Sequence, residues 1–226
     1  MYDCVNQGNI QGVMYIGGIS GSIGNANIIN SYNTGSISGG TKGATVYIGG
    51  ITGQYYCGTN SKIYLGNCYN LGNIETEGKG AGGIIGYAQN YIANGEIYNC
   101  YNLGTVSAQS DSASIAGMTS NPNIHDCYYL DTTGTDSDKT LLGEDASKTE
   151  AEFKDGTVAD LLNKNLTSQN GFKLWEVVDN ITTFSDKKVN IFSFNVSPSD
   201  ATVTLKDSNG QIVSKLNDKN TYINLK

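Results

Sequence analysis

Apolar residues recur at equivalent positions in successive copies of one unit along residues 1–130. Aligning the copies gives four columns, which are rich in β-branched residues and show no helical spacing. The columns are Ile10, Ile37, Ile74 and Val106; Ile16, Ile48, Ala81 and Ile115; Ile19, Ile51, Ile84 and Met118; and Ile28, Leu65, Ile97 and Ile124. The pattern predicts three short strands per turn, each giving one or two side chains to a shared interior.

Two motifs alternate in this region and define the repeat. The first is Asn67-Cys-Tyr-Asn-Leu-Gly-Asn-Ile, which returns at 99–106, with looser copies at 3–10 and 30–37. The second is Tyr47-Ile-Gly-Gly-Ile-Thr-Gly, which returns at 15–21, at 81–86 and, eroded, at 115–119. A period of about 30 residues is typical of solenoids. The L-x-x-L-x-L pattern of leucine-rich repeats is missing, and the shortest copy is too short for a propeller blade.

We therefore predict an all-β fold, a right-handed parallel β-helix (β-solenoid) of about four to five coils over residues 1–130. Strands of successive coils are expected to stack about 4.8 Å apart and to pair their backbone groups with the coils above and below. An Asn or Asp precedes each cysteine position and predicts a bend there, since these residues tolerate left-handed backbone. The paired glycines indicate close approach of backbone.

The cysteines fall mostly in one column of the repeat. Cys4, Cys68, Cys100 and Cys127 share the column, and Cys57 lies in a corner insertion. Strand spacing is slightly too long for a relaxed disulfide, so we expect buried free thiols rather than a disulfide framework. Whether Cys57 is paired stays open, and a CxxC pair for redox or metal chemistry is absent.

The composition changes near Asp131, and residues 131–188 predict a capping or linker segment with short helices. Residues 131–138 form a polar stretch that predicts a loop. Thr149 and Glu152 fit a helix capping box, followed by an apolar face of Val158, Leu161 and Leu162. Because a solenoid end exposes strand edges, the segment with the only tryptophan, Trp175, is expected to cap the last coil.

Residues 189–226 predict alternating strands, with a hairpin turn at 207–210. The segment resembles the start of a bacterial immunoglobulin-like module, carried by Val196-Ser-Pro-Ser-Asp-Ala-Thr-Val. The resemblance implies the first half of a β-sandwich, truncated at Lys226 before its later strands.

The net charge of the chain limits the classes of partner that it can bind. The chain of 226 residues has a net charge of −7 and contains no arginine, which excludes the clustered basic surface that nucleic-acid binding requires. No apolar run is long enough to cross a bilayer, and no leader opens the chain. Because Met1 falls inside a repeat, we interpret the sequence as an excised piece whose export signal and anchor, if any, were left off. We expect no membrane insertion of this fragment.

One column of exposed aromatic residues is the main candidate for a binding site. Tyr32, Tyr69, Tyr101 and Tyr128 each follow the cysteine position and are expected to point outward. The structural interpretation is a ladder of rings packed coil on coil, which any in-register repeat produces. The functional interpretation is a flat platform for sugar rings or for a protein partner. The structural interpretation is favoured, and both stay open.

The sequence gives little support for a catalytic site or a metal site. His125 is the only histidine, which removes two-histidine zinc sites. Glu75, Glu77 and Asp111 are the acids that a carbohydrate-active enzyme could use, although a solvated loop is the favoured interpretation of Glu75 and Glu77. The aspartates Asp131, Asp136 and Asp138 are a weak calcium candidate that misses the EF-hand spacing. We predict no catalytic residues and no cofactor.

The repeats resemble the GLUG-motif family of bacterial surface proteins, through the Gly-Gly-Ile-x-Gly motif at 17–21, 49–53 and 82–86 and the Cys-Tyr-Asn-x-Gly-x-Ile strand. The resemblance implies an extracellular multidomain protein in which a β-helix precedes immunoglobulin-like modules. Some members are metallopeptidases with an H-E-x-x-H zinc site, which does not occur here, so that activity is not carried over.

We therefore expect a non-catalytic structural or adhesive fragment of a bacterial surface protein. It would space or present neighbouring domains of the same chain, with a glycan or a host extracellular protein as partner. Two alternatives stay open: a carbohydrate-active β-helix enzyme, namely a polysaccharide lyase or glycosidase, and the non-catalytic β-helix part of a larger surface peptidase.

Overall fold

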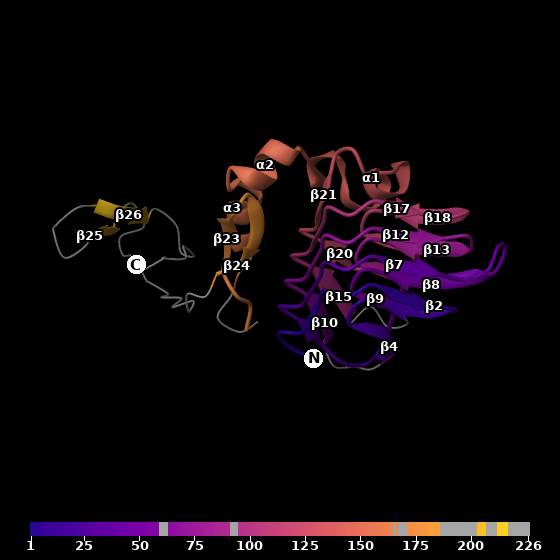
Figure 1. Ribbon diagram of the computed structural model, residues 1–226. Coiled ribbons are helices and arrows are strands. Elements are labelled where there is room, and N and C mark those ends of the chain that lie inside the picture. The colour runs from indigo at the N-terminus through magenta and orange to yellow at the C-terminus, as the bar shows by residue number, and fades with distance from the viewer. Residues whose placement is uncertain are drawn as a thin grey trace.

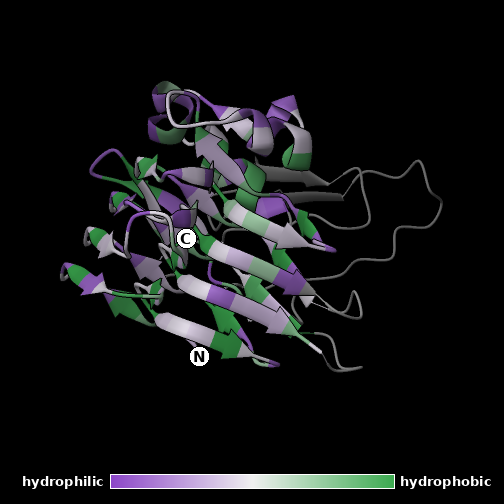
Figure 2. Cartoon of the chain, turned by 90° about the vertical axis from the view of Figure 1, so that its right-hand side faces the viewer, coloured by the Kyte–Doolittle hydropathy of each residue, from purple (hydrophilic) through white to green (hydrophobic). Residues whose placement is uncertain are grey.

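The computed structural model describes residues 1–58, 63–90, 95–164, 166, 171–185, 203–206 and 212–216. Residues 1–130 form five parallel sheets whose strands come from successive coils, stacked as in a β-helix (Figure 1). Figure 2 shows successive strands lying one above another. The all-β class and the parallel stacking predicted from the repeat columns are confirmed.

Each sheet takes every fifth strand in chain order. Sheet A contains β5 (Ile28–Ile29), β10 (Ile63–Gly66), β15 (Gly95–Tyr98) and β20 (Ile124–His125). Sheet B contains β1 (Val5–Asn6), β6 (Tyr32–Asn33), β11 (Tyr69–Asn70), β16 (Tyr101–Asn102), β21 (Tyr128–Leu130) and β22 (Ser147–Lys148). Sheet C contains β2 (Ile10–Gly12), β7 (Ile37–Gly39), β12 (Ile74–Thr76) and β17 (Val106–Ser107). Sheet D contains β3 (Tyr15–Gly17), β8 (Thr45–Gly49), β13 (Lys79–Gly82) and β18 (Ser110–Ala113). Sheet E contains β4 (Ser20–Gly24), β9 (Thr52–Cys57), β14 (Ile85–Asn90) and β19 (Ala116–Ser120).

The number of strands per turn differs from the sequence prediction. In the described part of the chain the first turn runs from β1 to β5, so a turn carries five strands rather than three. One bend in each turn, between sheets A and B, is made by left-handed backbone at an asparagine, where Asn30, Asn67 and Asn99 have φ of 53°, 53° and 57°. Asn is among the few residues other than Gly that visit this region routinely, which confirms the predicted bend before the cysteine column.

The apolar columns lie in register, with one correction in the fourth coil. Ile74 pairs with Ile37 on one side and with Val106 on the other. Ala81, however, pairs with Ser112, and Ile84 N–H donates to Ile115 O at 3.1 Å. Ile115 therefore continues the column of Ile84, and the predicted alignment was three residues out of step there. The prediction failed there because the fourth copy of the glycine motif, at 115–119, retains only part of the pattern on which the copies were aligned.

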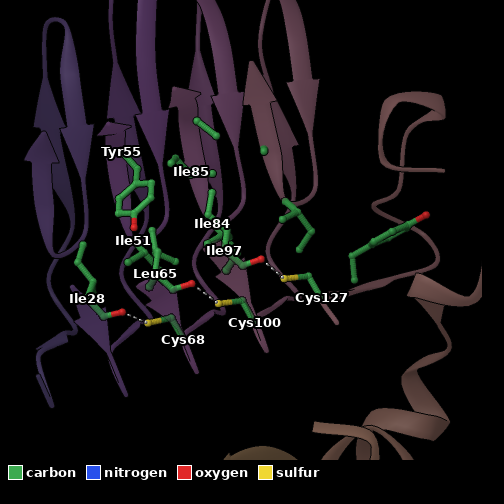
Figure 3. Close-up of a cluster of buried hydrophobic side chains, with 14 of the residues drawn as sticks. Ile28, Ile51, Tyr55, Leu65, Cys68, Ile84, Ile85, Ile97, Cys100 and Cys127 are labelled. Carbon is green, nitrogen blue, oxygen red and sulfur yellow. Dashed lines mark hydrogen bonds between the residues drawn. The ribbon is translucent and has the colours of Figure 1, made fainter. Parts of the chain in front are cut away.

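The interior contains two separate apolar clusters. One lies between sheets A and E and includes the cysteine column (Figure 3). The other lies between sheets C and D and is built from Ile16, Ile37, Val46, Ile48, Ile74 and Ala81. A column of buried amides, Asn33, Asn70 and Asn102, packs against the paired glycines. A Cβ at Gly50 would overlap Asn70, and one at Gly83 would overlap Asn102; each would also overlap the backbone of the next coil. The glycines are thus required by close approach, as predicted.

Residues 131–148 close the end of the β-helix at the last coil. Helix α1 (Asp136–Leu142) and a short 3-10 helix, η1 (Glu144–Ala146), lead into β22, which pairs with β21 and extends sheet B. The helix occupies part of the stretch predicted as a loop over 131–138. Its N-terminus is stabilised by a capping box between Thr135 and Asp138, a signal that the sequence already carried.

The described residues of the segment 149–185, which we name the strap, run along the side of the β-helix rather than over its end (Figure 1). It contains α2 (Glu150–Lys154), α3 (Thr157–Lys164) and the antiparallel pair β23 (Trp175–Val178) and β24 (Ile181–Phe184). The predicted capping box of Thr149 and Glu152 is confirmed. Gly156, with φ of 97°, separates the two helices, and the placement of Trp175 at the end of the solenoid was wrong.

Beyond the strap, β25 (Val203–Lys206) pairs antiparallel with β26 (Ile212–Leu216). The turn predicted at 207–210 and the strands predicted near Ile191 and Thr221 lie outside the described residues. Among the helices of the described residues, none combines the length and apolarity needed to cross a membrane.

Candidate functional site: a tyrosine row, its strap and a second aromatic strip

The predicted tyrosine row forms on the outer side of sheet B. The ring centroids of Tyr32 and Tyr69 lie 4.6 Å apart with planes 4° from parallel, and those of Tyr69 and Tyr101 lie 5.1 Å apart with planes 2° from parallel. Register places Tyr128 next in the row, opposite Tyr101. Stacking of equivalent rings on adjacent coils is the ladder that the sequence predicted.

The strap covers this row. Tyr69 is 3% exposed and Tyr101 is fully buried, whereas Tyr32 and Tyr128 at the two ends are half-buried. The cover consists of Phe153, Val158, Ala159, Leu162, Trp175, Val177 and Phe184. The expected outward direction is therefore right, but the expected exposure of Tyr69 and Tyr101 is wrong, because an apolar segment from later in the same chain packs on them.

Hydrogen bonds fix the strap to the tyrosine hydroxyls. Tyr69 Oη lies 2.9 Å from Thr183 Oγ1, and Tyr101 O–H donates to Thr182 O. Burial, together with the neighbouring Tyr32, raises the pKa of Tyr69 to about 12, although the Thr183 hydrogen bond lowers it in part. Burial also raises the pKa of Tyr101 well above its usual value. Both hydroxyls are therefore neutral groups held by the strap.

A ladder of asparagine amides beside the row provides the second attachment. Asn67 Nδ2 donates to Asn30 Oδ1 at 2.8 Å, and Asn99 Nδ2 donates to Asn67 Oδ1 at 2.7 Å. Trp175 Nε1 donates to the same Asn67 oxygen at 2.6 Å. The backbone of Lys173 pairs with the ladder in both directions, since its N–H donates to Asn30 and its carbonyl accepts from Asn67. The strap thus binds two adjacent coils at once.

The ladder ends at Asn99. Asn99 Oδ1 is buried without a hydrogen-bond partner, and the equivalent position in the next coil is Asp126, which carries no amide donor. The Asp126 carboxylate instead lies 2.6 Å from His125 Nδ1. His125 stacks on Tyr98 with centroids 5.2 Å apart, so the single histidine has a local structural partner.

The three aspartates considered for calcium do not gather. Among the residues that the structure describes, no group of three or more His, Cys, Asp or Glu side chains is placed to hold a metal ion. Asp138 is fully buried, and its carboxylate accepts from the N–H groups of Ser114 and Ile115 at 2.7 and 3.0 Å. Asp131 and Asp136 are exposed. Asp138 therefore anchors α1 to the last coil.

The acids considered for carbohydrate chemistry lie on the surface. Glu75 and Glu77 are exposed, and Asp111 is exposed on a different sheet, where its carboxylate accepts from Ser110 at 2.7 Å. Glu77 lines an open hollow together with Lys42 and Gln109.

The cysteines are free, as predicted. Cys57, Cys68, Cys100 and Cys127 are buried thiols and Cys4 is half-buried. The sulfurs of Cys68, Cys100 and Cys127 each point to a carbonyl of the coil before, at 3.8 Å for Cys68 to Ile28 O (Figure 3). Burial raises the pKa of Cys100 well above the ordinary thiol value, which keeps it protonated and unreactive.

A second aromatic strip was missed by sequence reasoning. Tyr15 and Tyr47 lie on sheet D with ring centroids 5.5 Å apart, and Tyr87 of sheet E lies 4.9 Å from Tyr47. Tyr15 and Tyr47 open the repeated Tyr-Ile-Gly-Gly motif, so the first two positions were visible as a column. Tyr87 was not, because it joins the strip from another sheet.

The fold defines a parallel β-solenoid built from an imperfect repeat of about 30 residues. Residues 77–107 match the family model described as the GLUG motif. The matched segment includes the third glycine motif and the second complete Cys-Tyr-Asn strand, which supports the family resemblance. No match was found among curated proteins or among solved structures.

Proposed function

We propose that this chain is a non-catalytic structural and adhesive module of a bacterial cell-surface protein. In this proposal a right-handed β-helix of four to five coils spaces or presents neighbouring domains and contacts glycans or host extracellular proteins. Residues 189–226 begin the next, immunoglobulin-like module. The chain acts through its surface and its rigidity rather than through a reaction.

The observation that carries the proposal is the strap. A segment following the solenoid returns along its side and joins sheet B through buried aromatic rings and the asparagine ladder. Ladder bonds at two adjacent coils hold the strap in one orientation. A module connected after Ser185 would therefore leave the solenoid from a fixed point, which is what a spacer needs.

Hydrogen exchange tests the rigid attachment. The amides of Lys173, Trp175 and Ser185 donate to Asn30 Oδ1, Asn163 Oδ1 and Leu174 O at 3.0, 2.8 and 2.8 Å. We expect peptides covering 171–185 to exchange as slowly as peptides covering 63–74 of the central coils. Exchange of the strap on the timescale of an open chain, while the coils stay protected, would contradict the spacer proposal.

The absence of catalysis is tested separately. The chain is incubated with neutral and acidic polysaccharides, with and without calcium, and new reducing or unsaturated ends are measured. We expect none above the level of a heat-denatured control. Cleavage that is lost in a Glu77→Gln variant would replace the proposal with the carbohydrate-active alternative.

A further inference from the structure

A strip of tyrosines on sheets D and E remains at the surface, unlike the row beneath the strap. Tyr15 is 46% exposed, and Tyr47 and Tyr87 are half-buried. The three residues come from three successive coils, with ring centroids 5.5 and 4.9 Å apart. The rings thus form a continuous aromatic path that crosses the coils.

Hydrogen-bonding groups accompany the strip on sheet E. Ser22 Oγ donates to Gln54 Oε1 at 3.1 Å, and Gln54 Nε2 donates to Gln89 Oε1 at 3.3 Å. These side chains also come from three successive coils, on β4, β9 and β14. Hydroxyl and amide groups therefore follow the same direction as the aromatic path.

The surface is neutral. On the four strands of sheet E, the half-buried and exposed side chains that the structure describes are all uncharged. The charged side chains of the neighbouring sheet D are Lys79 on β13 and Asp111 on β18, and the strip's own residues carry none. The combination of aromatic faces with neutral donors and acceptors suits a ligand that is itself uncharged, apolar on one face and rich in hydroxyl groups.

We propose that this surface, made by Tyr15, Tyr47, Tyr87, Ser22, Gln54 and Gln89, binds an extended neutral polysaccharide. The C–H faces of successive sugar rings pack on the tyrosines, and sugar hydroxyls exchange hydrogen bonds with the serine and the two glutamines. Because the aromatic and hydrogen-bonding groups come from three successive coils, a chain of several sugars meets several contacts at once. The inference rests on the proposed adhesive function and names its ligand class and its site.

Affinity electrophoresis in gels containing a polysaccharide tests the site on the full chain. The probes are a mixed-linkage β-glucan, an α-mannan and, as the charged comparison, polygalacturonate. We expect retardation by at least one of the two neutral polymers. Tyr47→Ala and Tyr15→Ala should each weaken that binding by about tenfold, since central aromatic anchors dominate such contacts.

Tyr2→Ala is the matched control, because Tyr2 is 56% exposed and is not part of the strip. It should bind as the unaltered chain does. If Tyr47→Ala fails to fold, as judged by circular dichroism, the more exposed Tyr15→Ala decides the result alone. The inference is overturned if neither neutral polymer retards the chain or if polygalacturonate retards it more strongly. It is also overturned if the folded strip variants, Tyr47→Ala and Tyr15→Ala, are retarded as much as the unaltered chain. None of these results would alter the exchange rates that test the spacer role.

Discussion

At the scale of single residues, Asn67 connects the solenoid to the strap. Its amide nitrogen donates to Asn30 Oδ1 and Lys173 O, and its oxygen accepts from Asn99 and from Trp175 Nε1. Its backbone has φ of 53°. One residue thus satisfies four buried partners and also makes the corner between sheets A and B.

Replacing Asn67 separates these two contributions. Asn67→Ala removes the hydrogen bonds and also puts alanine, which tolerates left-handed backbone less well than asparagine, at this corner, so we expect a loss of about 3 kcal/mol or more in the free energy of unfolding. Asn67→Gly removes the same hydrogen bonds without the backbone strain and should be about 1 kcal/mol less costly. Urea unfolding followed by Trp175 fluorescence measures both. A glycine variant as stable as the unaltered chain would show that the amide ladder contributes nothing.

The tyrosine hydroxyls predict an alkaline limit of stability. Burial raises the pKa of Tyr69 and of Tyr128 to about 12, whereas an unfolded tyrosine titrates near about 10. The neutral form is favoured in the folded chain, so its stabilising effect is complete below about pH 10 and is lost as pH rises towards 12. We expect tyrosinate absorbance to rise in two phases, the later one coinciding with exposure of Trp175 to acrylamide quenching.

Tyr69→Phe provides the control for this titration, because it keeps the ring in the stack and removes the ionising group. Its alkaline transition should move to higher pH, although the Thr183 hydrogen bond is lost. The explanation fails if all tyrosines ionise near pH 10 while Trp175 stays protected.

At the scale of elements, α1 is attached to the β-helix through one buried carboxylate. Asp138 is the third residue of the helix and accepts from Thr135 in the capping box as well as from Ser114 and Ile115 of the last coil. The capping interaction is local, but the bonds to the last coil connect residues more than twenty positions apart. The helix therefore covers the final coil in a defined orientation.

Asp138→Asn should detach this cover. An amide N–H₂ group in place of one carboxylate oxygen would face a backbone N–H, leaving a buried donor unsatisfied at a cost of about 2 kcal/mol. Asp136→Asn, exposed in the same helical turn, should change stability by less than about 0.5 kcal/mol. Thermal unfolding compares the two, and faster hydrogen exchange at Ser114 and Ile115 in Asp138→Asn alone would confirm the attachment. Equal effects of the two substitutions would contradict it.

At the scale of the whole molecule, the stacking of coils gives equivalent glycines of the repeat different amounts of space for a side chain. Gly8, Gly35, Gly72 and Gly104 form one column, and a Cβ at Gly72 would overlap Gly35 O of the coil below. A Cβ at Gly8 would meet only Asn6 Oδ1, at 3.8 Å. The tolerance of each glycine therefore depends on whether another coil lies beneath it.

Alanine substitutions measure this difference directly. Gly72→Ala forces two central coils apart, so we expect a loss of about 3 kcal/mol in the free energy of unfolding. Gly8→Ala should change it by less than about 0.5 kcal/mol. Denaturant unfolding of both variants is the measurement. Similar losses at the two positions would mean that the glycine column serves the backbone conformation rather than coil contact.

Much of the solenoid could be predicted because its determinants are local and repeated. The columns of Ile37, Ile74 and Val106 and the Asn corners follow from spacing alone, and each copy supports the assignment of the others. The fourth coil was misaligned where the motif is eroded at 115–119, and the strand count per turn was low because two-residue strands leave no period to detect.

The candidate site was harder to predict, since its surroundings come from distant residues. The sequence identified the stacked row of Tyr69 and Tyr101, but it could not show that Thr182 and Thr183 would bind their hydroxyls across more than eighty residues. It also missed the strip of Tyr15, Tyr47 and Tyr87, which combines two different repeat positions.

By itself the sequence determined the parallel β-helix, the corner asparagines, the free thiols and the direction of the tyrosine row, because an in-register repeat places like residues over like. The tertiary structure alone decided which aromatic surface is covered. Burial of Tyr69 and Tyr101 depends on an apolar face of the strap and on amide partners from other coils. Such a contact has no period along the chain, so only the folded arrangement distinguishes a buried tyrosine from one that remains open to a ligand.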